Sequence, residues 1–204
     1  MADYATSAEL KAQLGITDAV DDTAIASVLT AASKAVREHC GRDFSPAGAA
    51  VARVYAPNDD TCLEVDDIST LTGLVVKSDE NDDGTYELTW TITTDFIVGP
   101  HNALADGEPV TRLSAVGSKG FPVGTMRPTV QVTASFGWVA VPADVKRATL
   151  IKAARLFRRK DTPEGVAGGG DFGVVRISRW EDPDVAMLLA PYVRPSRATG
   201  WGIA

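Results

Sequence analysis

The sequence predicts an α+β fold, in which a small helical bundle from both chain ends carries an inserted antiparallel β lobe, either a sandwich or barrel-like. Three patterns predict it: apolar residues at helical spacing in residues 1–48, short β-branched runs in residues 49–140, and a second helical pattern in residues 141–190. At 204 residues and 45% hydrophobic composition, the chain can bury one good core, or one core plus a small inserted lobe.

Two helices are predicted in residues 1–48. Ser7 precedes a short run with two leucines one turn apart, and Gly15 can adopt the left-handed conformation that ends it. A longer helix begins after Asp21 or Asp22 and closes at Gly41. Its apolar residues recur at three- and four-residue spacing: Ile25, Val28, Leu29, Ala32, Ala35 and Val36.

Residues 49–140 are rich in β-branched and aromatic runs, which are typical of strands. The predicted strands lie within residues 51–55, 74–76, 86–92, 96–98, 110–113 and 129–136. Turn-forming sequences separate them at residues 57–60, 81–84, 106–107 and 117–120. Several short strands joined by such turns favour a small antiparallel sandwich or barrel.

A third helix is predicted from Pro142 to about Lys160. At 100° per residue, one arc is apolar and the opposite arc carries five cations: Arg147, Lys152, Arg155, Arg158 and Arg159. Residues 161–173 hold so much glycine that we expect a mobile loop in the free subunit. A short strand is predicted at residues 174–178, a last helix from Asp182 to Leu189, and an extended docking tail over residues 191–204.

The order of these pieces resembles a known family. A short helix, a spacer ending in two aspartates, an Ala-rich helix and the terminator CGRDF over residues 40–44 resemble the N-terminal region of head-tail connector (adaptor) proteins of tailed bacteriophages. The proline-initiated helix, the glycine-rich loop and the DPDV sequence of residues 182–185 are similar to the C-terminal region of the same family.

That resemblance implies a structural virion protein and no enzymatic activity or cofactor. It implies a ring of about twelve copies at the head-tail interface, made in the host cytoplasm and placed below the portal protein. The other implied partners are a tail-side stopper or tail-completion protein and double-stranded DNA, which passes through the lumen without sequence-specific binding. No apolar run of about 18 residues is present, so no membrane partner is expected.

Interface residues are expected in the C-terminal third, as contacts to another copy or to the portal. They are Arg147, Lys152, Arg155, Arg158, Arg159, Tyr192, Arg194, Arg197 and Trp201. The basic arc has three readings: contact with acidic residues of a neighbour, neutralisation of DNA phosphates, or simple solvation. Residues 1–80, 81–141 and 142–204 carry net charges of −8, −3 and +4, which suits head-to-tail stacking of subunits or a set of solvated faces.

No catalytic or metal-binding residues are predicted. Residues 79–84 match the first half of an EF-hand loop, but Trp90 occupies the position of the bidentate glutamate, which favours a hairpin turn. His39 and His101 have no suitable partners for catalysis. Cys40 and Cys62 lack the spacing of a zinc site and are expected to be reduced.

The main alternative is a ligand- or carbohydrate-binding β module of a virion or cell-surface protein. In that reading Trp90, Phe136 and Trp138 would form the binding surface, although aromatic residues on strands usually belong to the core. A DNA-binding protein is a third reading, which the isoelectric point near 4.8 disfavours.

Overall fold

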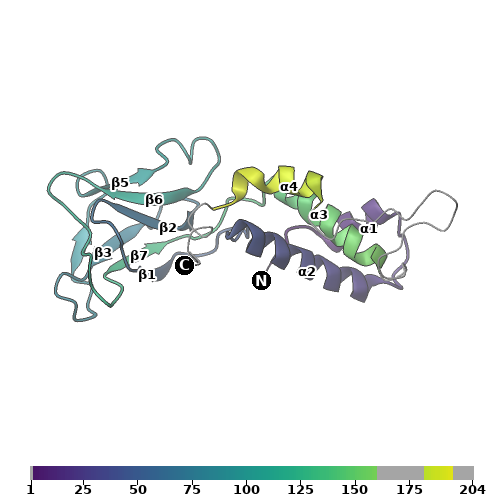
Figure 1. Cartoon of the computed structure of the whole chain (residues 1–204), viewed down its shortest axis with the longest axis horizontal. Coiled ribbons are helices and arrows are strands. Elements are labelled where there is room, and N and C mark those ends of the chain that lie inside the picture. The colour runs from purple at the N-terminus through teal and green to yellow at the C-terminus, as the bar shows by residue number, and fades with distance from the viewer. Residues whose placement is uncertain (1, 160–181, 195–204) are drawn as a thin grey trace, which may run out of the picture. The chain divides into compact units, whose positions relative to one another are not determined.

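The computed structural model describes residues 2–159 and 182–194, and these form two compact units (Figure 1). One unit comprises residues 1–45 with residues 141–204, and the other comprises residues 46–140. The predicted loop at residues 161–173, the strand at residues 174–178 and most of the tail at residues 191–204 lie outside the described residues. None of the described helices is long and apolar enough to cross a membrane.

The helical unit contains four α-helices and a short 3₁₀ helix within its described residues. Their bounds are α1 Ser7–Leu14, α2 Asp22–Cys40, α3 Ala143–Arg158, α4 Pro183–Leu189 and η2 Ala190–Tyr192. Thr6, not Ser7, caps α1, because its side chain accepts the Glu9 N–H while the Glu9 carboxylate accepts the Thr6 N–H. Gly15 and Gly41 end α1 and α2 with φ of 73° and 64°, as predicted from their sequence positions.

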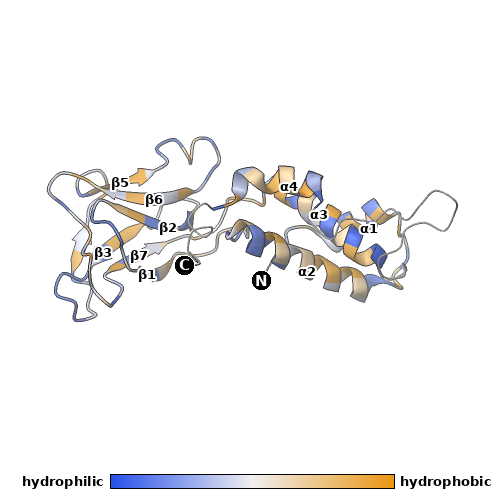
Figure 2. Ribbon diagram, in the orientation of Figure 1, coloured by the Kyte–Doolittle hydropathy of each residue, from blue (hydrophilic) through white to orange (hydrophobic). Residues whose placement is uncertain are grey.

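The core of this unit lies between α2 and α3, with α1 packed on both. Apolar and polar residues lie on different sides of α2 and α3 (Figure 2), and each of these two helices buries its apolar stripe. Small side chains such as Ala32 and Ala153, both fully buried, let the helices approach closely. The fully or largely buried residues of this core are Ala5, Leu10, Ile25, Leu29, Ala32, Leu150, Ala153, Ala154 and Phe157.

The β unit consists of two antiparallel sheets. The first has the order β1-β7-β3-β4, with β1 Val51–Tyr55, β3 Val75–Ser78, β4 Leu88–Trp90 and β7 Val130–Ala134. The second has the order β2-β6-β5, with β2 Cys62–Ile68, β5 Phe96–Gly99 and β6 Val110–Ala115. Both sheets contribute to one core, and within residues 46–140, all of which are described, neither sheet closes into a barrel. The predicted α+β class with an inserted antiparallel lobe is confirmed, and the lobe is a sandwich.

Strand β2 was not predicted from the sequence. Three carboxylates in seven residues make it look like a loop, because acidic residues are rare in strands. The structure gives two of them partners: Asp66 binds Arg53 at 2.6 Å, and the buried Asp67 accepts the Trp138 indole N–H at 3.1 Å. Leu63 and Val65 meanwhile alternate inward, so the strand follows the usual two-residue period.

Candidate interaction surfaces

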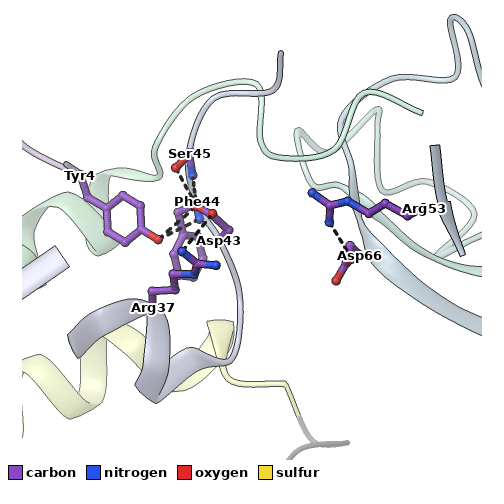
Figure 3. A network of polar contacts seen from close by, with 7 residues as sticks. All are labelled: Tyr4, Arg37, Asp43, Phe44, Ser45, Arg53 and Asp66. Atoms are coloured by element: carbon purple, nitrogen blue, oxygen red, sulfur yellow. Dashed lines mark hydrogen bonds and ion pairs between the residues drawn. The ribbon is translucent and has the colours of Figure 1, made fainter. Parts of the chain in front are cut away.

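The end of α2 is held by a small polar network (Figure 3). The Tyr4 hydroxyl accepts the Phe44 N–H at 3.2 Å and donates to Asp43 at 3.4 Å. Asp43 also accepts the Ser45 hydroxyl at 2.6 Å and N–H at 3.0 Å, and Arg37 lies 3.6 Å away. Partial burial acts to raise the pKa of Asp43, but the Ser45 hydrogen bonds and the Arg37 charge outweigh it and lower that pKa. Burial raises the pKa of Tyr4 to about 12, so its hydroxyl remains a donor.

Phe44 is the apolar centre of the same region, with no exposed surface. Its ring makes edge-to-face contacts with Tyr4 at 5.6 Å and with Tyr192 at 5.7 Å. The Arg194 N–H then donates to the Cys40 carbonyl at 3.0 Å, which satisfies one of the open carbonyls at the end of α2. Tyr192 and the Arg194 backbone, expected to face another protein, therefore contact their own helical unit.

The basic arc of α3 is partly paired within the unit. Arg155 donates to Asp182 at 2.9 Å, and Asp182 is the residue whose side chain caps α4. Arg147 donates to the Gln13 amide oxygen on α1 at 3.3 Å. Lys152 is half-buried, whereas Arg158 and Arg159 are exposed. Arg147 and Arg155 thus make contacts within their own unit. That the basic arc contacts another copy or the portal stays a prediction.

A further cation of α3, Lys146, was missed from the sequence. It lies 3.0 Å from Glu9 and ties α3 to the start of α1. A hydrogen bond from the Thr6 N–H and a second from Lys146 lower the pKa of Glu9 to about 2. The two partners are 137 residues apart, so no local sequence pattern could have paired them.

The two structural units carry very different net charges. Residues 46–140 hold 13 acidic and 5 basic residues, a net charge of −8. The remaining residues hold 14 acidic and 15 basic residues, a net charge of +1. The strong acidity therefore belongs to the β unit, whereas the helical unit is almost neutral.

The aromatic residues of the alternative reading are largely core residues. Trp90 is 4% exposed, stacks on Phe121 at 4.7 Å and donates to Ser78 at 2.8 Å. Trp138 is 3% exposed and donates to the buried Asp67. The Phe136 ring is covered by the Arg53 guanidinium at 4.1 Å. These three aromatic rings do not form the open platform that stacking on a sugar requires.

The EF-hand-like sequence forms a hairpin turn, as predicted. Strands β3 and β4 pair antiparallel through Val76 and Trp90. Between them the carboxylate of Asp79, which is fully buried, accepts the backbone N–H groups of Asn81, Asp83 and Gly84 at 3.2, 3.3 and 2.7 Å. A carboxylate already bonded to three backbone donors organises the turn itself.

Among the described residues, no group of three or more His, Cys, Asp or Glu side chains is placed to hold a metal ion. Cys40, which is buried, and Cys62, which is half-buried, are free cysteines. The interactions of the described side chains set out above are hydrogen bonds, ion pairs and packing contacts.

Comparison with known proteins agrees with the N-terminal pattern. Residues 4–81 match the family model of the phage gp6-like head-tail connector protein. No curated protein matches the sequence. In its fold the chain is similar to a chain in the neck of an empty GTA particle computed with C6 symmetry, with 20% identity, a TM-score of 0.54 and coverage of 92% of this chain and 88% of that one. It is also similar to a chain in the neck of a native GTA particle computed with C12 symmetry, with 19% identity, a TM-score of 0.51 and coverage of 91% and 86%. The match over residues 4–81 confirms the resemblance to head-tail connector proteins that was predicted from the two N-terminal helices.

Proposed function

We propose that the protein is a structural connector of a virion, located at the head-tail interface. About twelve copies form a ring below the portal protein, join it to the tail-side component and leave a lumen through which double-stranded DNA passes. The observation that carries this proposal is the family match over residues 4–81, which spans α1, α2 and the first strands of the β unit.

The fold supports the same function. More than nine tenths of the chain aligns with chains from particle necks that were computed with six-fold and twelve-fold symmetry. A ring needs two different contact faces on every subunit, because a head-to-tail contact repeats around a closed circle. Among the described residues, every buried side-chain nitrogen or oxygen has a hydrogen-bond partner, and such an arrangement suits a role based on shape rather than catalysis.

We place one contact face on the exposed cations of α3 and on the C-terminal tail. Arg158 and Arg159 are exposed at the end of α3, and Arg197 and Trp201 follow in the tail sequence. The acidic β unit of net charge −8 provides complementary charge for such a face on an adjacent copy.

The test is assembly with the portal. The full chain should bind purified portal particles and add a ring of density below them in negative-stain images. A double variant, Arg158→Gln with Arg159→Gln, should weaken ring formation, and the wild-type ring should become less stable as salt rises, because salt screens exposed charges. Lys34→Gln is the matched control, since Lys34 is an exposed cation on α2.

The outcomes separate the readings of the basic arc. A chain that neither binds the portal nor forms a ring refutes the connector proposal. Normal rings with altered genome retention in the double variant would assign these arginines to the DNA path. Normal rings and normal infectivity would mean that the two arginines contribute neither to contacts between proteins nor to the DNA path.

A further inference from the structure

Strand β1 is an edge strand with an open side. In the four-stranded sheet all five of its residues pair with β7, and the sheet order places no other strand of the described residues beside it. In an antiparallel pair, alternate residues direct their N–H and C=O groups away from the partner. The free side of β1 therefore offers a ready template for one more strand.

The other three sheet edges are less suitable for pairing. Strand β4 has only three residues, and β5 has four and is followed by Pro100. Strand β2 carries three carboxylates, and its register shifts between Glu64 and Ile68. Short strands, charges and irregular registers are the usual means by which proteins discourage edge pairing.

Apart from the charge of Arg53, β1 has none of these protections. Its sequence VARVY contains no proline and no lysine, and its register with β7 is continuous. Val51 and Val54 are each 50% exposed, and Ala52 is exposed as well. An exposed, regular and mostly apolar edge strand is a docking site or an aggregation hazard unless another segment covers it.

The single charge of β1, Arg53, is exposed but paired within the β unit. Arg53 binds Asp66 of β2 at 2.6 Å (Figure 3) and its guanidinium covers the Phe136 ring. The Tyr55 hydroxyl donates to the same Asp66 at 3.2 Å. Burial, and to a lesser extent the negative charge of Asp66, raises the pKa of Tyr55 to about 12. Two side chains therefore fix β1 to the neighbouring sheet, so its open edge is already in place before a partner arrives.

We propose that residues 174–178 of a neighbouring copy add to this edge as an antiparallel or parallel fifth strand. This segment, VVRIS, is as long as β1, has three β-branched apolar residues and is the one stretch of residues 160–181 with a strand pattern. Arg176 and the following Arg179 give it positive charge, which complements the β unit of net charge −8.

Symmetry favours this occupant over a second β1. Pairing of β1 with β1 is a two-fold contact that produces dimers and brings two units of net charge −8 together. Insertion of residues 174–178 into the next copy is a head-to-tail contact, which repeats around a ring. In this respect the inference rests on the ring proposed above and names one contact within it.

The first test uses a synthetic peptide of residues 172–180 and the full-length protein. The peptide should slow amide hydrogen exchange of residues 51–55, and a scrambled peptide should not. Val54→Lys adds an edge charge and should abolish the protection, whereas the control Val123→Lys, at a loop valine with 44% exposure, should leave it intact. Unchanged exchange of β1 with the native peptide would overturn the inference, whether or not rings form.

The second test asks which copy donates the segment. Copies carrying Val54→Cys are mixed with copies carrying Ile177→Cys on the portal, both in a Cys62→Ser background, while Cys40 stays because it is buried. A disulfide between the two kinds of copy is expected, and Thr89→Cys on the short edge strand β4 should give none. Disulfides between two Val54→Cys copies, or rings with no mixed disulfide, would refute docking by a neighbour while leaving the connector function intact. Absence of rings would refute the connector function, and the peptide result would still decide whether the edge binds this segment.

Discussion

Phe44 is the residue whose replacement should test the helical unit most directly. It has no exposed surface, and its ring contacts the rings of Tyr4 and Tyr192, which come from the two ends of the chain. Phe44→Leu keeps an apolar side chain of similar size but removes both edge-to-face contacts. The variant therefore separates the aromatic contribution from simple burial.

The expected loss follows from two contributions. A volume-conserving apolar replacement in a core costs up to about 1.5 kcal/mol. Each of the two aromatic pairs adds about 0.5–1.5 kcal/mol beyond its buried area. Phe44→Leu should thus lower the free energy of unfolding of the helical unit by about 1–4.5 kcal/mol. Phe44→Ala should cost more, about 3–5 kcal/mol from the cavity and lost burial alone.

The assay is urea unfolding followed by two signals. Far-ultraviolet circular dichroism reports mainly on the helical unit. Tryptophan fluorescence reports on the β unit through Trp90 and Trp138, provided that Trp180 and Trp201 are replaced by phenylalanine in every variant. The control is Ala134→Gly on β7, which weakens a fully buried position of the β unit and should shift fluorescence first.

The reasoning is wrong if Phe44→Leu changes the free energy of unfolding of the helical unit by less than about 0.5 kcal/mol, the usual size of surface effects. It is also wrong if the fluorescence transition falls as much as the circular dichroism transition. Either result would mean that the three rings do not stabilise the helical unit as their contacts indicate.

Three further predictions concern polar contacts. The pKa of Glu9 falls from 4.5 to about 2 on folding, so its hydrogen bonds should stabilise the protein above pH 4.5, and this stability should be lost as the pH falls toward 2. In Glu9→Gln the melting temperature should therefore depend less on pH between 4.5 and 2 than in the wild type. Arg155→Gln should cost about 1 kcal/mol in urea unfolding by freeing the capping residue Asp182, and a gain in stability would contradict the pairing. Calcium should leave the melting temperature unchanged relative to a chelator, because Asp79 is occupied by backbone donors, whereas Asp79→Ala should lower it.

The parts of the fold that the sequence predicted are those with local causes. Helix α2 follows from apolar residues at helical spacing and from Gly41, whose positive φ of 64° a side chain would resist. The strands at residues 51–55 and 130–134 follow from β-branched runs. In these segments each residue's neighbours in sequence are also the ones that decide its conformation.

The parts that were missed depend on distant partners. Strand β2 is stabilised by Arg53 of β1, which pairs with Asp66, and by Trp138 in the segment after β7, which donates a hydrogen bond to Asp67. Tyr192 looked exposed because nothing near it in sequence shows that Phe44 will lie against its ring. The same holds for Arg155, whose partner Asp182 lies beyond the glycine-rich sequence. The sequence around such residues shows their chemical type but does not identify the distant residues that they contact.

The charges bear on how a lumen for DNA could work. Each phosphate that a cation neutralises strengthens binding, so a passage for DNA functions best with few uncompensated cations. In the helical unit, Lys146 and Arg155 already bind carboxylates of the same unit, and the net charge is only +1. The β unit, at −8, repels phosphate and attracts basic protein segments instead. A ring that exposes either unit to its lumen would therefore bind DNA weakly, and the attraction between unlike charges remains available for contacts between proteins.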